Sequence, residues 1–128
     1  MIIVNIFKAL SAFFILLLIV GCSTTQGVPV PDINNIKTKE AIIQVNRPSS
    51  LLGGARTVDI YDFDKKIGEL GSGGTLTWSR PEGKTCLGTR QTNLFEQKFD
   101  IKCFVAEGGK VTKFQFDYLK AEFTSEGN

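Results

Sequence analysis

From Glu40 onward the chain consists of short runs in which apolar and polar residues alternate, separated by turn-forming residues. Alternation with a period of two is typical of strands that bury one face, and no stretch of this region keeps the spacing of an amphipathic helix. Clusters of glycine, proline and aspartate mark the breaks between the runs. The pattern predicts strands at residues 41–45, 56–63, 66–70, 75–79, 84–89, 99–105, 111–118 and 121–124, and leaves room for a helical turn only within 87–96.

The alternation also predicts which side chains enter the core. Leu76 and Trp78 share one face of their strand, which favours a buried Trp78 over an exposed ring that stacks on a sugar. In the run 99–105 the odd-numbered residues are apolar and are predicted to point inward, with Asp100 and Lys102 pointing outward. The prediction is an all-β domain, a small antiparallel β-sandwich of about seven to eight short strands.

The N-terminal segment follows a different pattern. Residues 9–20 are almost entirely apolar and follow a single charged residue, Lys8. A run of this length suits the central region of a secretory signal peptide and is short for a membrane-spanning helix, which needs roughly 20 apolar residues. Residues 18–22, Leu-Ile-Val-Gly-Cys, close the run. They resemble the lipobox of bacterial lipoproteins, which implies cleavage before Cys22 and acylation of its thiol.

This resemblance implies a location and a first partner. Each buried methylene contributes about 0.8 kcal/mol, so two or three palmitate-type chains on Cys22 would hold the protein firmly to a lipid bilayer. Ser23 resembles the outer-membrane sorting pattern of enteric-type bacteria, so the expected location is the bacterial cell envelope, at the outer membrane facing the periplasm. The alternative is an uncleaved signal anchor, in which the apolar residues before Lys8 extend the run.

The predicted domain organisation has three parts. Residues 1–21 are the lipoprotein signal peptide, and residues 22–39 are a lipidated N-terminus and flexible tether, because they contain no aromatic residue and carry prolines and polar turn formers. A flexible segment of this length spans about 20–25 Å. Residues 40–128 are predicted to form a single β-sandwich domain.

Charge and cysteine content narrow the classes of partner. Removal of the signal peptide takes away Lys8 and leaves 14 basic and 13 acidic side chains. This near-neutral balance argues against nucleic acid, which requires a clustered basic surface. Export to an oxidising compartment favours a disulfide between Cys86 and Cys103, the cysteines that remain beside Cys22. Two buried free thiols or a metal pair are the alternatives, although the chain has no histidine to complete a zinc site.

Several short motifs follow one another along the domain. An aliphatic strand ending in Arg-Pro (41–48) comes first, and a Gly-Lys pair (109–110) precedes the last long strand. Between them lie Gly53–Arg56, Val58–Ile60, Lys66–Leu70, Gly73–Leu76 and Pro81–Gly83. This order, over about Glu40 to Phe116, resembles domain of unknown function 2846, a family of small bacterial proteins. The chain departs from it in having Lys84, where the family often has histidine, and in its cysteine pair. The resemblance implies a β-sandwich, often behind a lipoprotein signal, with no established activity.

The sequence contains no recognisable catalytic constellation. Without histidine, Ser-His-Asp and Cys-His arrangements are impossible, so we expect no enzyme, no cofactor and no metal. Asp59, Asp62 and Asp64 are interpreted as strand-surface and turn residues rather than as catalytic carboxylates or a calcium loop. The Gly53–Arg56 segment is interpreted as a connection between strands rather than as an anion-binding loop.

Three residues are candidates for contact with a partner. Tyr61 and Phe63 lie on the strand face opposite to Ile60, and exposed aromatic side chains there would form an interface patch. Arg47 is predicted either to bind a partner or to pair with a carboxylate at the end of the sheet.

The expected function is that of a non-catalytic envelope lipoprotein, a binding or structural module whose partner beside the bilayer is an envelope protein or glycan. One alternative is an assembly component of a secretion or envelope machine. The other is a periplasmic inhibitor or immunity-type lipoprotein.

Overall fold

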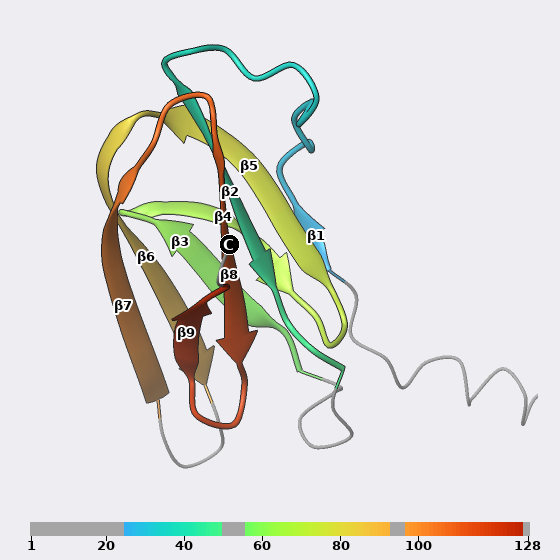
Figure 1. Cartoon of the computed structure of the whole chain (residues 1–128). Helices are drawn as coiled ribbons and strands as arrows, with labels where there is room; N and C mark the ends of the chain where they lie inside the picture. Colours follow the sequence, from blue (N-terminus) through green and yellow to red (C-terminus); the bar gives the residue numbers. More distant parts are fainter. Residues whose placement is uncertain (1–24, 50–55, 93–96, 127–128) are drawn as a thin grey trace, which may run out of the picture.

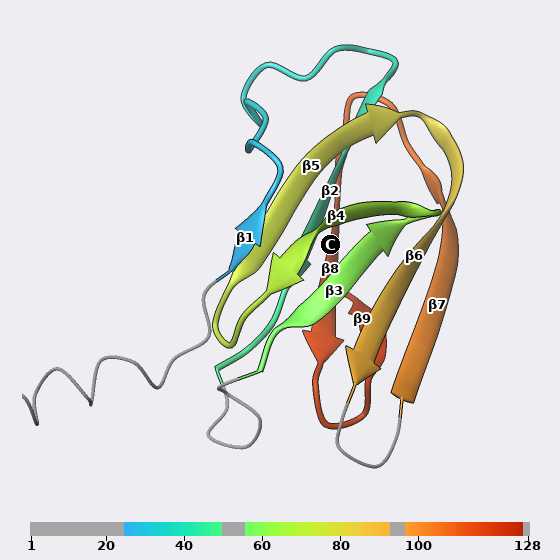
Figure 2. The same ribbon diagram turned by 180° about the vertical axis from the view of Figure 1, so that it is seen from behind.

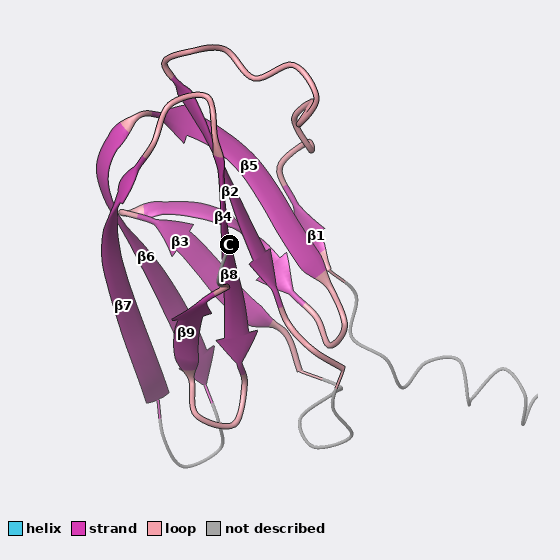
Figure 3. Cartoon of the chain, in the orientation of Figure 1, coloured by secondary structure: helices cyan, strands magenta, loops and turns pink. Residues whose placement is uncertain are grey.

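Two β-sheets packed face to face make up the part of the chain that the computed structural model describes, residues 25–49, 56–92 and 97–126 (Figure 1). For residues 91–92 and 97–99 the backbone alone is described. The described part contains nine strands and no helix, as the colouring in Figure 3 shows. The predicted all-β sandwich is therefore confirmed.

One sheet has five antiparallel strands in the order β1-β4-β3-β6-β7. They are β1 (Gln26–Gly27), β3 (Val58–Asp62), β4 (Lys65–Leu70), β6 (Gly83–Thr92) and β7 (Gln97–Ala106). Figure 2 shows β4, β3, β6 and β7 side by side from behind.

The other sheet has four strands in the order β5-β2-β8-β9. They are β2 (Glu40–Asn46), β5 (Thr75–Pro81), β8 (Val111–Asp117) and β9 (Glu122–Ser125). β2 pairs antiparallel with β5 and parallel with β8. Only the hairpins β3–β4, β6–β7 and β8–β9 stay within one sheet, so the two sheets are connected by repeated crossings.

The predicted runs correspond to β2–β9 with small shifts at their ends, whereas β1 was not predicted. Gln26–Gly27 pairs with β4, and the Val28 N–H donates to a β4 carbonyl over 3.2 Å. The two strands approach closely, because a Cβ on Gly68 of β4 would lie 2.3 Å from the Gln26 carbonyl oxygen. The prediction of a flexible tether up to Lys39 is therefore wrong for Gln26–Val28: glycines on both strands let this segment dock as an edge strand.

The core lies between the sheets and is built from side chains at alternate strand positions. Leu76 and Trp78 are buried there, as predicted. The ring of Phe104, which is partly buried, packs on that of Phe114 with their centroids 4.8 Å apart, so β7 and β8 meet across the core. Each fully buried side chain of this kind contributes about 1.5–3 kcal/mol to stability. Other buried members are Ile43, Val45, Ile60, Leu70, Leu87 and Phe116.

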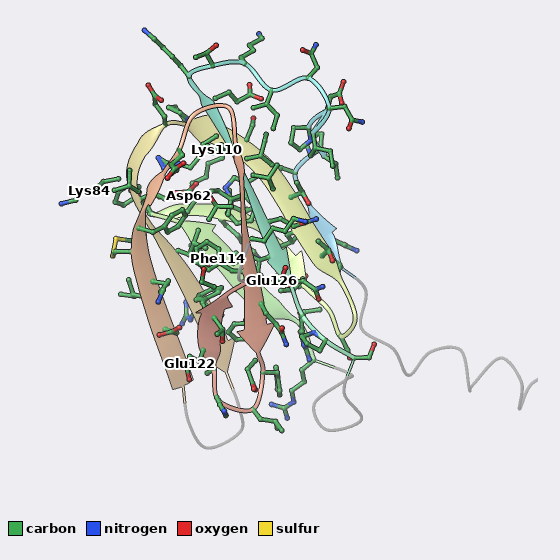
Figure 4. The ribbon with its side chains drawn as sticks, viewed as in Figure 1. Asp62, Lys84, Lys110, Phe114, Glu122 and Glu126 are labelled. Atoms are coloured by element: carbon green, nitrogen blue, oxygen red, sulfur yellow. A yellow bond between two sulfur atoms is a disulfide. The ribbon has the colours of Figure 1, made fainter. Side chains whose placement is uncertain are left out.

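A carboxylate is buried at the end of β3, where Asp62 is 9% exposed (Figure 4). Trp78 Nε1–H donates to Asp62 Oδ2 over 3.0 Å, and the Thr85 hydroxyl donates to Oδ1. Arg80 Nε lies 3.4 Å from Oδ2 and forms an ion pair. Because β5 supplies two of these partners and β6 the third, Asp62 links the two sheets. The interpretation of Asp62 as a surface or turn residue is wrong, since its place on β3 puts it on the inward face.

Replacement of Asp62 by alanine is expected to lower the free energy of unfolding by about 3–5 kcal/mol, because Trp78 loses its acceptor and Arg80 loses its counter-charge. The Arg80 side chain is 14% exposed, so water replaces the lost partner poorly. Asp59→Ala is the matched control: Asp59 and Lys66 form an exposed ion pair at 3.3 Å, whose loss costs about 1 kcal/mol or less. Urea unfolding of both variants measures the difference, and equal losses would contradict the role given to Asp62.

Candidate functional site

The outer face of the five-stranded sheet carries exposed apolar groups. The inward positions of β6, all buried, are Thr85, Leu87 and Thr89. The alternate residues Cys86 and Gly88 therefore face outward. On β7, Ile101 and Val105 also face outward and are 70% and 61% exposed. Phe63, in the turn after β3, is 55% exposed and lines the same hollow as Ile101, so these two large apolar side chains share one patch of the surface.

The strand register places Tyr61, Gly88 and Ile101 in one row across β3, β6 and β7. Because Gly88 has no side chain, this row has a gap between Tyr61 and Ile101. The heavy atom nearest to a Cβ built on Gly88 would be the Tyr61 Cβ, at 3.7 Å, so the gap has room for a side chain. The result is a shallow groove of about 740 Å³ lined mainly by apolar atoms of Tyr61, Phe63, Cys86, Gly88 and Ile101, which we call the sheet groove.

A disulfide closes one side of the sheet groove. Cys86 and Cys103 lie directly opposite each other on β6 and β7 and are bonded, which confirms the predicted pair. β7 is the edge strand, so the bond fastens the edge of the sheet to β6 rather than stapling its centre. Closing a loop of this length stabilises by about 3 kcal/mol in the chain-entropy model. Figure 4 shows the sulfur atoms near Lys84, whose side chain points away from the sandwich.

Phe63 is held in a strained backbone conformation at the groove. Its φ is 53°, in the left-handed region, and its N–H donates to the Cys86 carbonyl over 2.9 Å. The left-handed conformation costs a residue other than glycine about 1–2 kcal/mol. Strained residues of this kind cluster at functional sites, where the side chain is needed at that position.

A minority of the residues that line the sheet groove are charged. Asp64, Arg90 and Asp100 contribute to its lining and carry both signs of charge. Beside it, hydrogen bonds with Glu69 and then with Asp59 raise the pKa of Lys66 above its ordinary value. The groove therefore offers an apolar surface with a mixed polar margin, which fits an apolar group better than a charged one.

The prediction that residues 101, 103 and 105 point inward is wrong, because Phe104 and Ala106 occupy the inward face of β7. Asp100, predicted to point outward, accepts a hydrogen bond from the Phe123 N–H at 2.9 Å. The side chain of Phe99 lies outside the described residues. Gly88 and Ile101 were therefore not predicted as site residues. The available signal was Phe104 and Ala106, which make the opposite face apolar as well.

Arg47 does not lie on the surface. It is 1% exposed, and its Nη1 donates to the carbonyls of Arg56, at 2.6 Å, and Leu70, at 2.8 Å. The guanidinium carbon lies 4.4 Å from the centre of the Tyr118 ring, which adds a cation–π contact. Burial lowers the pKa of Arg47 from its ordinary value. The prediction of Arg47 as an interface residue is wrong, because the carbonyls at the strand ends and an aromatic ring hold it inside.

Some of the other predicted site residues lie in the described part of the chain, and others lie outside it. Asp64 is exposed in the β3–β4 turn and Asp59 is half-buried on the outer face of β3, as expected of turn and surface residues. Cys22 and the predicted signal peptide lie outside the described residues, as do Gly53 and Gly54 of the glycine-rich segment.

A second groove, of about 710 Å³, lies between β7 and β8 and has a more polar lining. Figure 4 shows Lys110, Phe114 and Glu126, which contribute to it. Lys110 Nζ lies 2.8 Å from Glu107 Oε2, and this contact lowers the pKa of Glu107. Because this groove is lined mainly by polar and charged groups, the sheet groove is the stronger candidate for binding an apolar group.

Within residues 25–49, 56–92 and 97–126, no helix is long and apolar enough to cross a membrane. Across the same residues, no three of the side chains that commonly bind metals (His, Cys, Asp, Glu) come together.

Comparison with known proteins finds no matching family model, no matching curated protein and no matching solved structure. The resemblance to domain of unknown function 2846 therefore stays a prediction that rests on the order of motifs alone.

The strained backbone at Phe63 predicts which of two variants without the ring, Phe63→Gly and Phe63→Ala, is the more stable. Phe63→Gly is expected to be more stable than Phe63→Ala by about 1 kcal/mol, because glycine adopts the left-handed conformation without steric cost. At an ordinary strand position the order is reversed, since glycine loses more conformational freedom on folding. Urea unfolding compares the two, and an alanine variant of equal or higher stability would show that Phe63 is not strained.

Proposed function

We propose that this protein is a non-catalytic bacterial envelope lipoprotein, anchored through an acylated Cys22, that binds another envelope protein through the sheet groove. The observation that carries the binding role is the exposure of Phe63 and Ile101, which both line a groove whose lining is mainly apolar. Contiguous exposed apolar surface on a small domain marks an interaction site.

The lining of the groove supports a protein partner over a glycan. A sugar ring needs hydrogen-bond partners around the surface on which it stacks, whereas the floor here consists of Gly88, the disulfide and the aliphatic Ile101. An apolar side chain of a partner would fill the gap at Gly88 between Tyr61 and Ile101. Protein interfaces are built in this way, with a desolvated apolar centre and a polar rim.

The envelope location is supported by the N-terminal sequence. The apolar run of residues 9–20 ends at a lipobox-like segment before Cys22. The disulfide fits an oxidising compartment such as the periplasm. Attachment to the outer membrane, facing the periplasm, and a relationship with domain of unknown function 2846 are parts of the same proposal.

A non-catalytic role is supported by the chemistry of the groove. The disulfide leaves no free thiol in the groove. Its two carboxylates are Asp64, a turn residue, and Asp100, which accepts a hydrogen bond from the Phe123 N–H, and the chain has no histidine to act with them. The buried carboxylate of Asp62 faces the opposite side of the sheet and is held by Trp78 and Thr85.

Filling the groove tests the binding role without harming the fold. Gly88→Val is expected to abolish capture of the partner, because the added side chain occupies the gap between Tyr61 and Ile101. The stability of this variant should stay equal or rise by up to about 1 kcal/mol, since valine suits a strand interior better than glycine. The measurement is affinity capture from chemically cross-linked native envelopes, with the captured proteins identified by mass spectrometry.

Ile101→Ser should weaken capture in the same way. The matched controls are Val30→Ser and Ile33→Ser, which remove apolar side chains that are 74% and 51% exposed in the loop before β2. Proteins recovered with the wild type and both controls, but not with Gly88→Val or Ile101→Ser, support the groove. Equal recovery with all five proteins would overturn it.

The anchor predicts a defined N-terminus. The protein isolated from native membranes should begin at Cys22 and carry the mass of a diacylglyceryl group, with or without a further amide-linked chain. Cys22→Ser should remain unprocessed and lose the added mass. Intact-mass spectrometry measures both proteins, and an unmodified Met1 on the wild type would overturn acylation.

A further inference from the structure

The docking of β1 determines where the chain enters the sandwich. β1 is antiparallel to β4, so its first residues lie beside the end of β4. The Gly71 N–H donates to the Thr25 hydroxyl over 2.9 Å, and a Cβ on Gly74 would collide with the same hydroxyl. Thr25 is therefore fixed on the β4–β5 turn.

The same end of the sandwich contains two further segments. A Cβ on Gly73 would lie 2.6 Å from the Ser49 hydroxyl, so the chain after β2 touches the β4–β5 turn. Ser49 in turn lines a hollow together with Tyr118 and Leu119 of the β8–β9 turn. We call this end, made of Thr25, Ser49, Gly71–Gly74 and Leu119, the anchor end. Figures 1 and 2 place the β4–β5 and β8–β9 turns in the lower part of the molecule and the start of β1 a little below its middle, on one flank.

The anchor end presents an apolar and a basic side chain. Leu119 is 58% exposed. The carboxylate of Asp117 accepts hydrogen bonds from the N–H groups of Leu119, at 3.0 Å, and Lys120, at 3.1 Å, and so fixes the turn. An exposed leucine next to a lysine suits the boundary between acyl chains and lipid phosphates, because the leucine can enter the apolar layer while the lysine lies near a phosphate.

We propose that the sandwich rests on the lipid bilayer by its anchor end, with Leu119 at the membrane surface. This inference rests on the proposed attachment to the membrane before Thr25, but not on the chemistry of that attachment. Only two residues, Ser23 and Thr24, separate Cys22 from Thr25, and the three steps along the chain span at most about 11 Å. The ten-residue strand β6 is about 33 Å long, so the opposite end of the domain cannot turn to the membrane.

The end of the sandwich opposite to the anchor end provides a control position for a test of the orientation. β2 begins there at Glu40, whose N–H donates to the Lys37 carbonyl over 3.0 Å, and it ends at Asn46, beside Thr75 after the β4–β5 turn. β2 is seven residues long, so its two ends lie about 20 Å apart. Lys37 is therefore far from the bilayer in the proposed orientation.

Tryptophan quenching by brominated lipid tests the orientation. The full chain carrying Leu119→Trp or Lys37→Trp is produced in a bacterial host, extracted from its membranes and reconstituted into phosphatidylethanolamine–phosphatidylglycerol vesicles with brominated acyl chains. The wild type supplies the background of Trp78, which is buried. The Leu119→Trp variant should lose most of its added emission and the Lys37→Trp variant little of it. Equal quenching of the two vesicle-bound proteins would overturn the proposal.

Two further variants test the role of β1. Gly68→Ala places a Cβ within 2.7 Å of β1 backbone atoms and should undock it, which lengthens the free link to the membrane. An insertion of about ten Gly-Ser residues between Thr24 and Thr25 adds about 16–19 Å of reach without touching the sandwich. Both should relieve the quenching in the Leu119→Trp background, and full quenching with the long insertion would overturn the role of the short link.

Failure of acylation and failure of the orientation are distinguishable. An unmodified Met1 on vesicle-bound protein would overturn acylation. The protein would then be held by a signal anchor that ends before Cys22, which leaves the same short link to the sandwich. The quenching experiment therefore still tests the orientation. A protein that does not sediment with the vesicles would overturn both proposals.

Discussion

The inward position of Leu87 on β6 determines how the whole candidate site is built. Successive residues of a strand face opposite sides, so a buried Leu87 turns Cys86 and Gly88 outward. Cys86 is bonded to the residue directly opposite on β7, and this bond requires Cys103 to face the same side. Ile101, two residues before Cys103, then has to face outward as well. The sheet groove follows from one buried leucine, one disulfide and the period of a β-strand.

This dependence explains what the sequence could and could not predict. Alternation and turn residues were sufficient to predict the sandwich and β2–β9, because each of these strands carries its own apolar pattern. The same pattern could not decide which face of β7 points into the core, since Ile101 on one face and Phe104 on the other are both apolar. β1 has no apolar pattern and docks through a close backbone approach at Gly68, which depends on its partner strand rather than on its own residues. Arg47 was misplaced because its acceptors are carbonyls brought together by the fold.

Two residues of the sheet groove are poor choices for stability alone. Gly88 lies inside a strand, where a β-branched residue would stabilise more, and Phe63 adopts a conformation that suits glycine. Each breaks a local rule without an evident gain elsewhere in the fold, and the two lie in the same groove. Violations of local consistency are expected at functional sites, where shape for a partner competes with stability. Gly88 and Phe63 therefore add support for the binding role to that given by the exposed apolar side chains.

The positions of the sheet groove and the anchor end indicate how the protein would present its binding surface beside the membrane. The groove lies on the outer face of the five-stranded sheet, and the anchor end lies where β1 and the β4–β5 turn meet, so contact with a bilayer leaves the groove open on the flank. A short link also restricts rotation of the domain, which keeps the groove at a nearly constant height above the membrane. A partner attached to the same membrane would then meet the groove at a raised effective concentration, because both proteins are confined to one surface. A freely diffusing partner gains nothing from this confinement, so the geometry favours a partner that is itself held in the envelope.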